Sequence, residues 1–183
     1  MFLLALILVA ALPATAPAAS WLDQPLAPWA SGPSVPAAAA RSASSGRACL
    51  VDSPASTEAD QLRTAGWRPF QLFDRPIARG ALLVLGGLRD LTGDCAPADF
   101  QAFVFVGGRF AGTLSPVEMT TAQDGVVGTI RLVSDDVVTA EFARYRSGDS
   151  ECCPSGRVRV TYRIERGSPG PRAVPVDVKV LRE

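Results

Sequence analysis

A regular alternation of apolar and polar residues near the C-terminal end most constrains the fold. Every second residue over 158–164 is apolar, and the residues between them are mostly arginine. Because successive side chains of a strand point to opposite faces, this pattern predicts a strand with one buried and one solvated face. A second alternation covers 174–180, after the turn-rich segment 167–171. The two segments predict neighbouring antiparallel strands.

A pair of glycines marks a hairpin earlier in the chain. Gly107-Gly108 separates the apolar run 103–106 from the segment 109–113. Two-residue hairpin turns require positive φ, which glycine adopts without steric cost. The predicted register pairs Val106 with Arg109 and Phe105 with Phe110.

Three further segments have strand character. The apolar run 81–85 predicts a short buried strand. Segments 129–133 and 137–145 flank Ser134-Asp135-Asp136, whose residues favour turns, and predict another hairpin.

One amphipathic helix is predicted over 54–65. Ser53 is expected to cap its N-terminus, with Pro54 at the first helical position. Apolar residues at 55, 59 and 62 form one stripe, and Gly66 supplies the left-handed stop. The expected fold is therefore disulfide-stapled α+β: this N-terminal helix packed on a five- to six-stranded antiparallel sheet.

The first 20 residues have the layout of a secretory signal peptide. An apolar run over 2–12 precedes Pro13 and the small residues Ala16-Pro17-Ala18. Residues 21–47, rich in Pro and Ala, predict an extended arm, either held along the domain by Trp21 and Trp29 or a flexible spacer. Residues 48–183 then form a single domain, and we expect an extracytoplasmic (periplasmic or secreted) protein without stable membrane insertion after signal cleavage.

Four cysteines, Cys49, Cys95, Cys152 and Cys153, are expected to form two disulfides in an oxidising compartment. A bond between Cys152 and Cys153 is not expected, because ordinary disulfides span Cα atoms about 4.4–6.8 Å apart. Cys152 and Cys153 should instead each form a disulfide with Cys49 or Cys95, and the sequence does not decide which of the two pairings occurs.

The composition narrows the possible functions. No histidine is present, which excludes Ser-His-Asp and Cys-His catalysis and histidine-containing zinc sites within this chain. Eighteen basic residues balance eighteen acidic ones, so no global charge favours nucleic acid. No motif indicates a catalytic residue, a metal or a cofactor, and we expect none.

Three groups of residues are weighed as possible sites. The loop 114–121, with Ser115 and Glu118, could bind a target, although an ordinary connection is the simpler interpretation. Arg157, Arg159 and Arg163 share one strand face and could bind an acidic partner, although pairing with Asp177 or nearby carboxylates is favoured. Acidic residues suited to a glycosidase pair or a calcium site follow no ligand motif: Asp94, Asp99, Asp124, Asp135, Asp136 and Glu141.

Several segments between the predicted helix and Tyr162 carry a family resemblance. They are Gly66-Trp67, Asp94-Cys95, the runs 103–106 and 108–116, Phe142-Ala143-Arg144-Tyr145 and Cys152-Cys153-Pro154-Ser155. The chain resembles the LppP/LprE family of bacterial envelope lipoproteins. The resemblance implies an extracytoplasmic protein and brings no catalytic residues. Unlike a lipoprotein, this chain has no cysteine at the end of the leader to accept lipid, so we expect a released or periplasmic form.

These observations favour a cell-envelope binding or structural module that lacks a catalytic centre and engages an unknown envelope component or protein. One alternative is a carboxylate-dependent hydrolase acting on wall polysaccharide. Another is a secreted inhibitor that presents the loop 114–121 to a protein target.

Overall fold

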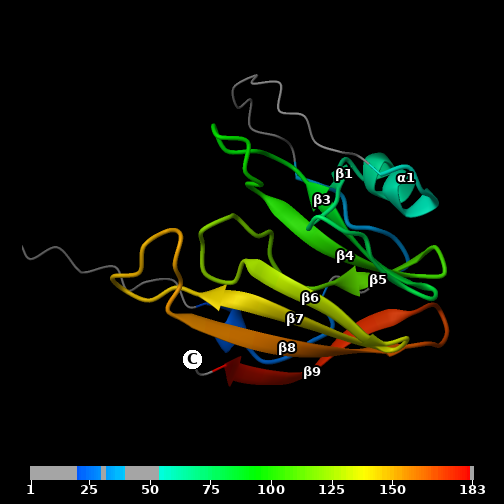
Figure 1. Ribbon diagram of the computed structural model, residues 1–183. Helices are drawn as coiled ribbons and strands as arrows, with labels where there is room; N and C mark the ends of the chain where they lie inside the picture. The colour runs from blue at the N-terminus through cyan, green and yellow to red at the C-terminus, as the bar shows by residue number, and fades with distance from the viewer. Residues whose placement is uncertain (1–19, 30–31, 40–53, 182–183) are drawn as a thin grey trace, which may run out of the picture.

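Two antiparallel sheets stacked face to face form the body of the protein, and one helix covers the outer side of the upper sheet (Figure 1). The computed structural model describes residues 20–29, 32–39 and 54–181. Ser53, Cys49 and most of the predicted leader lie outside these residues.

The five-stranded sheet has the order β1-β3-β4-β5, and β2 also pairs with β3. Its strands are β1 (Arg68–Phe70), β2 (Ile77–Arg79), β3 (Leu82–Leu88), β4 (Phe100–Val106) and β5 (Arg109–Thr113). The four-stranded sheet has the order β6-β7-β8-β9. Its strands are β6 (Val127–Ser134), β7 (Val137–Arg144), β8 (Gly156–Glu165) and β9 (Arg172–Leu181).

The glycine hairpin between β4 and β5 is confirmed. Gly107 and Gly108 have φ angles of 55° and 76°, the left-handed conformation that the turn requires. Val106 pairs with Arg109 and Phe105 with Phe110, as predicted. The two phenyl rings pack edge to face with centroids 6.0 Å apart.

The alternating segments also form the predicted strands. Asp135 and Asp136 form the turn between β6 and β7, where Ser134 pairs with Val137. Strands β8 and β9 pair along their lengths, although a bulge near Val176 shifts the register between Thr161 and Tyr162.

The predicted helix is present but shorter. Helix α1 spans Thr57–Thr64, and its N-cap is Ser56, whose side chain accepts a hydrogen bond from the Ala59 amide at 3.2 Å. The expected first position at Pro54 is therefore wrong: a serine further along satisfies a free amide of the first turn. The predicted stop is confirmed, because Gly66 has a φ of 90° and follows the C-cap.

The prediction of one sheet is wrong: the strands divide between two sheets, and the domain is mostly β. All seven residues of β4 are buried. One face of the five-stranded sheet packs against α1, where Ala59 and Leu62 are fully buried beside Phe103. The opposite face packs against the four-stranded sheet, so both faces of the first sheet are covered. The helix also follows the arm rather than opening the fold.

The described part of the arm is held against the core. Trp21, in the 3-10 helix η1 (Trp21–Asp23), and Trp29 are 7% and 9% exposed. Trp21 packs edge to face against Trp29 and Phe142, and Trp29 against Tyr162. In its described residues, the arm is therefore held along the domain by Trp21 and Trp29, which was the first of the two interpretations.

Candidate functional site

The outer face of the four-stranded sheet collects basic side chains. Strand β8 turns Val158, Val160 and Tyr162 into the core, so its arginines point outward. Pairing places Lys179 beside Arg159 in the next strand, and Arg131 of β6 opposite Thr139 of β7. This surface is called the basic face and comprises Arg131, Arg157, Arg159, Arg163 and Lys179.

Some of these charges are neutralised and others are not. Arg159 bonds to Glu141 on β7 at 2.5 Å, so the predicted pairing with a nearby carboxylate is confirmed there. Asp177 lies opposite Thr161 instead. Among the described residues, Arg131, Arg163 and Lys179 have no carboxylate within ion-pair distance, and all three are exposed.

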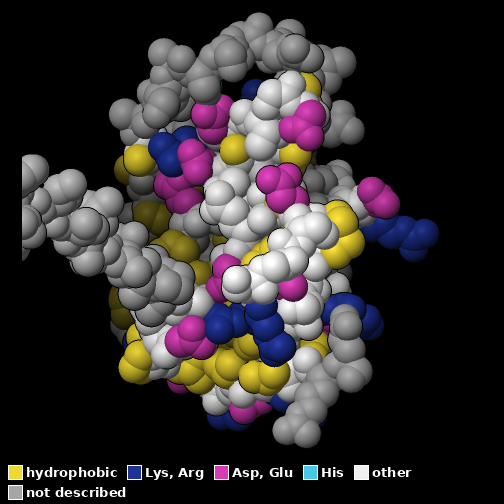
Figure 2. All heavy atoms as spheres, turned by 90° about the vertical axis from the view of Figure 1, so that its left-hand side faces the viewer, with side chains coloured by type: hydrophobic (Ala, Val, Ile, Leu, Met, Phe, Trp, Pro, Cys, Tyr) yellow, Lys and Arg dark blue, Asp and Glu magenta, His cyan; other side chains and the backbone are white. Residues whose placement is uncertain are grey.

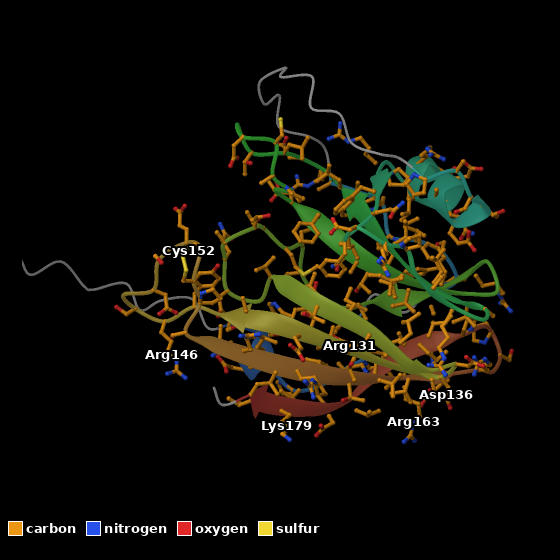
Figure 3. All side chains as sticks on the ribbon, viewed as in Figure 1. Arg131, Asp136, Arg146, Cys152, Arg163 and Lys179 are labelled. Carbon is orange, nitrogen blue, oxygen red and sulfur yellow. A yellow bond between two sulfur atoms is a disulfide. The ribbon has the colours of Figure 1, made fainter. Side chains whose placement is uncertain are left out.

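The strand register explains why Arg163 has no ion-pair partner among the described residues. Arg163 lies between Val137 and Val174 in the register, and neither valine side chain carries a hydrogen-bond acceptor. In Figure 3, the side chains of Arg163 and Lys179 point away from the body of the sandwich. The basic face therefore presents guanidinium and ammonium groups to solvent.

The loop 114–121 is fastened to the core. Ser115 is fully buried, and its hydroxyl lies 2.9 Å from Gln101 Oε1 and 2.6 Å from the Val117 carbonyl. Gln101 Nε2 donates to the carbonyls of Ser115 and Val117, and Glu118 bonds to Arg89 at 2.7 Å. Ser115 is therefore bonded inside the protein, whereas Pro116 and Val117 of this loop are exposed.

Each acidic candidate is engaged by its own neighbour. Asp99, Asp124 and Asp135 lie 2.8, 3.4 and 3.3 Å from arginine nitrogens, and Glu141 lies on Arg159. A hydrogen bond from the Thr92 hydroxyl lowers the pKa of Asp94, and Asp136 accepts one from Ser134. Each of these six carboxylates is therefore bonded to another residue of the protein.

Four pockets lined by described residues do not gather acidic groups. Each of them is lined by at most one carboxylate: two contain Asp60 of α1 and Asp23 of η1, respectively, and the other two contain none. Within the same described ranges, no group of three or more His, Cys, Asp or Glu side chains could hold a metal ion.

The cysteines differ from the predicted pairing. Cys152 and Cys153 are bonded to each other, with Cα atoms 3.8 Å apart, in the exposed turn between β7 and β8. The prediction was wrong because it relied on the Cα–Cα distance of ordinary disulfides. A turn can bring the sulfur atoms of two consecutive cysteines within bonding distance. Cys95 is also in a disulfide, and Cys49 lies outside the described residues. The Cys152–Cys153 bond joins neighbours and does not cross-link two elements of the fold.

Asp149 closes the loop that carries these cysteines. Its carboxylate accepts hydrogen bonds from the amides of Arg146 and Ser155, at 2.7 and 2.9 Å. The Ser155 bond, followed by the Arg146 bond, lowers the pKa of this carboxyl. A further bond runs from the Tyr145 hydroxyl to the Glu151 carbonyl at 2.7 Å. The loop is thus tied at both ends.

The sequence of this region matches a known family. Residues 85–167 match the family model described as LppP/LprE lipoprotein. Over this segment the chain is similar to the LppP/LprE lipoprotein family. The segment runs from β3 to just beyond β8 and includes the Cys-Cys-Pro-Ser element, whereas Gly66-Trp67 precedes it. No curated protein and no solved structure matches the chain.

The match to the LppP/LprE lipoprotein family is compatible with a protein associated with the cell envelope. No helix in the described ranges is long and apolar enough to cross a bilayer. Four of the five cations of the basic face lie in the LppP/LprE segment, and Lys179 follows it.

The sequence reasoning singled out Arg157, Arg159 and Arg163 but missed Arg131 and Lys179 as parts of the same surface. A signal for both was present. Each lies at a polar position in a strand of alternating pattern, so each shares the face of the arginines once strand order is known.

Proposed function

We propose that this LppP/LprE-family chain is a cell-envelope binding module without a catalytic centre, and that its basic face binds an acidic protein. The observation that carries the proposal is the presence of three exposed cations without carboxylate partners among the described residues: Arg131, Arg163 and Lys179. Arginine side chains in such a position are available for bidentate bonds to carboxylates.

The shape and composition of the face favour a protein over a small ligand. A four-stranded sheet offers a continuous surface, and between its cations stand threonine and valine side chains. Such a mixture suits the polar rim of a protein interface. A small anionic ligand is better served by a concave pocket lined with a few convergent donors.

Photo-cross-linking in the native envelope tests this proposal. A photoreactive amino acid placed at Thr161, in the middle of the basic face, should form a discrete adduct with one protein. Charge reversal by Arg131→Glu or by Arg163→Glu should reduce the yield of this adduct, because each replaces an attraction with a repulsion.

Arg75→Glu is the matched control. Arg75 is exposed in the connection between β1 and β2, near the other sheet, and the same change in charge there should leave the yield unaltered. Equal yields from all three variants would refute binding through the basic face. Separately, a hydrolase activity of the purified chain that is lost on changing one carboxylate would overturn the absence of a catalytic centre.

A further inference from the structure

The last strand of the four-stranded sheet has an open edge. Strand β9 pairs with β8 on one side, and no described strand pairs with its other side. The beginning of β9 is covered, since Ala173 lies against Gly112 of β5. Beyond the bulge, residues 176–180 are exposed, and they are called the open edge.

The open edge is apolar on one face. Val176, Val178 and Val180 are 45%, 38% and 63% exposed. Val178 and Val180 also line a pocket of about 190 Å³ together with Leu22 and Val158. Figure 2 shows hydrophobic side chains gathered at this end of the sandwich, beneath basic ones. A free strand edge with exposed valines is a template for pairing with another strand.

The sequence of the edge is complementary to itself. If two copies pair antiparallel with Val178 on the two-fold axis, Asp177 of each copy lies opposite Lys179 of the other. Val176 then lies opposite Val180 on the same face as the two central valines. Every cross-strand pair in this register is either apolar or of opposite charge.

Neighbouring registers lack this complementarity. Placing the axis on Asp177 sets two carboxylates directly opposite each other, and placing it on Lys179 sets two ammonium groups opposite each other. Like charges directly across a strand pair are destabilising. Asp177 and Lys179 have no ion-pair partner among the described residues, so both are available for a second copy.

We propose that the open edge is a homodimer interface, in which residues 176–180 of two copies pair antiparallel about a two-fold axis at Val178. The two four-stranded sheets then form one continuous sheet, and the contact is isologous, so the assembly closes at two copies. The proposal shares Lys179 with the basic face, but it does not depend on what Arg131 and Arg163 of that face bind.

Sedimentation of the full chain tests the proposal. The wild-type chain should show a monomer–dimer equilibrium between micromolar and millimolar concentrations. Asp177→Lys alone and Lys179→Asp alone should each weaken dimerisation roughly tenfold or more, because each sets like charges across both symmetry-related pairs. The combined variant keeps the net charge and restores both pairs, so it should dimerise like the wild type.

Cysteine cross-linking checks the register. Val178→Cys places the two introduced thiols opposite each other and should give a covalent dimer on mild oxidation. Val176→Cys should not, because its two copies stand four residues apart, roughly 13 Å. A wild-type chain that is monomeric up to millimolar concentration would overturn the proposal. The proposal would also be overturned if the combined variant dimerised as weakly as the single variants, or if Val176→Cys and Val178→Cys cross-linked equally.

Discussion

Tyr162 supplies the only buried phenol hydroxyl among the described tyrosines, and its removal has a cost that can be worked out. The ring is fully buried between the sheets, and its hydroxyl donates a hydrogen bond to the carbonyl of Leu114, which is buried as well. Tyr162→Phe keeps the ring and its edge-to-face contact with Trp29. It leaves the carbonyl without this donor in a site closed to solvent.

The expected loss is about 1–3 kcal/mol of the free energy of unfolding, the cost of a buried acceptor left unsatisfied. For a chain of this size each kcal/mol lowers the melting temperature by about 2–4 °C. Tyr145→Phe is the matched control: its hydroxyl bonds to the Glu151 carbonyl in an exposed loop, so its loss should stay within about 0.5 kcal/mol. Urea titration followed by tryptophan fluorescence measures both variants.

The same tyrosine predicts a dependence on pH. Burial raises the pKa of Tyr162 well above its ordinary value of about 10, which the unfolded chain retains. Above pH 10 the unfolded chain therefore binds fewer protons than the folded one, and the free energy of unfolding falls as pH rises. The contribution is complete below pH 10 and declines above it by up to about 1.4 kcal/mol per pH unit.

Tyr162→Phe should remove this alkaline decline, so the difference between wild type and variant should shrink as pH rises from 10 to 11. A variant as stable as wild type at pH 7, or a difference that stays constant through the alkaline range, would refute the reasoning.

Two further predictions concern packing and the cysteine turn. A Cβ added at Gly86 would lie 2.4 Å from the ring of Phe70, so Gly86→Ala should lower the free energy of unfolding by about 1–3 kcal/mol, as measured by thermal unfolding. Gly93→Ala is the control, because nothing lies within 4 Å of the added Cβ, and it should cost little. Equal losses in the two variants would contradict this prediction. Changing Cys152 and Cys153 together to serine should alter the free energy of unfolding, measured by urea titration, by less than about 1 kcal/mol, because their bond closes no long loop. A loss near about 4 kcal/mol would contradict this, because it would indicate a disulfide between distant segments of the chain.

Local features of this protein could be read from its residues. The Gly107-Gly108 turn, its register and the stop at Gly66 depend on positive φ, which few residues other than glycine adopt readily. The alternation in β8 and β9 assigned each residue to a face, because the side-chain period of a strand is fixed by its backbone.

Capping and cysteine pairing were predicted less well, because several arrangements satisfy the same local rule. Ser53 and Ser56 are both acceptable caps, and the free amide of Ala59 is reached by Ser56. Cys152 and Cys153 could reach other cysteines or each other, and the conformation of the turn decided.

By itself, the sequence determined the approximate positions of strands β3 to β9, the turn chemistry and the alternation of side chains between two faces, since these follow from backbone geometry over a few residues. Only the tertiary structure decided that the strands divide into two sheets, that Arg131 and Lys179 join the arginines of β8, and that the edge of β9 stays open. These features depend on which segments pack together in space. That packing follows from the burial of both faces of the five-stranded sheet, which no local sequence pattern specifies.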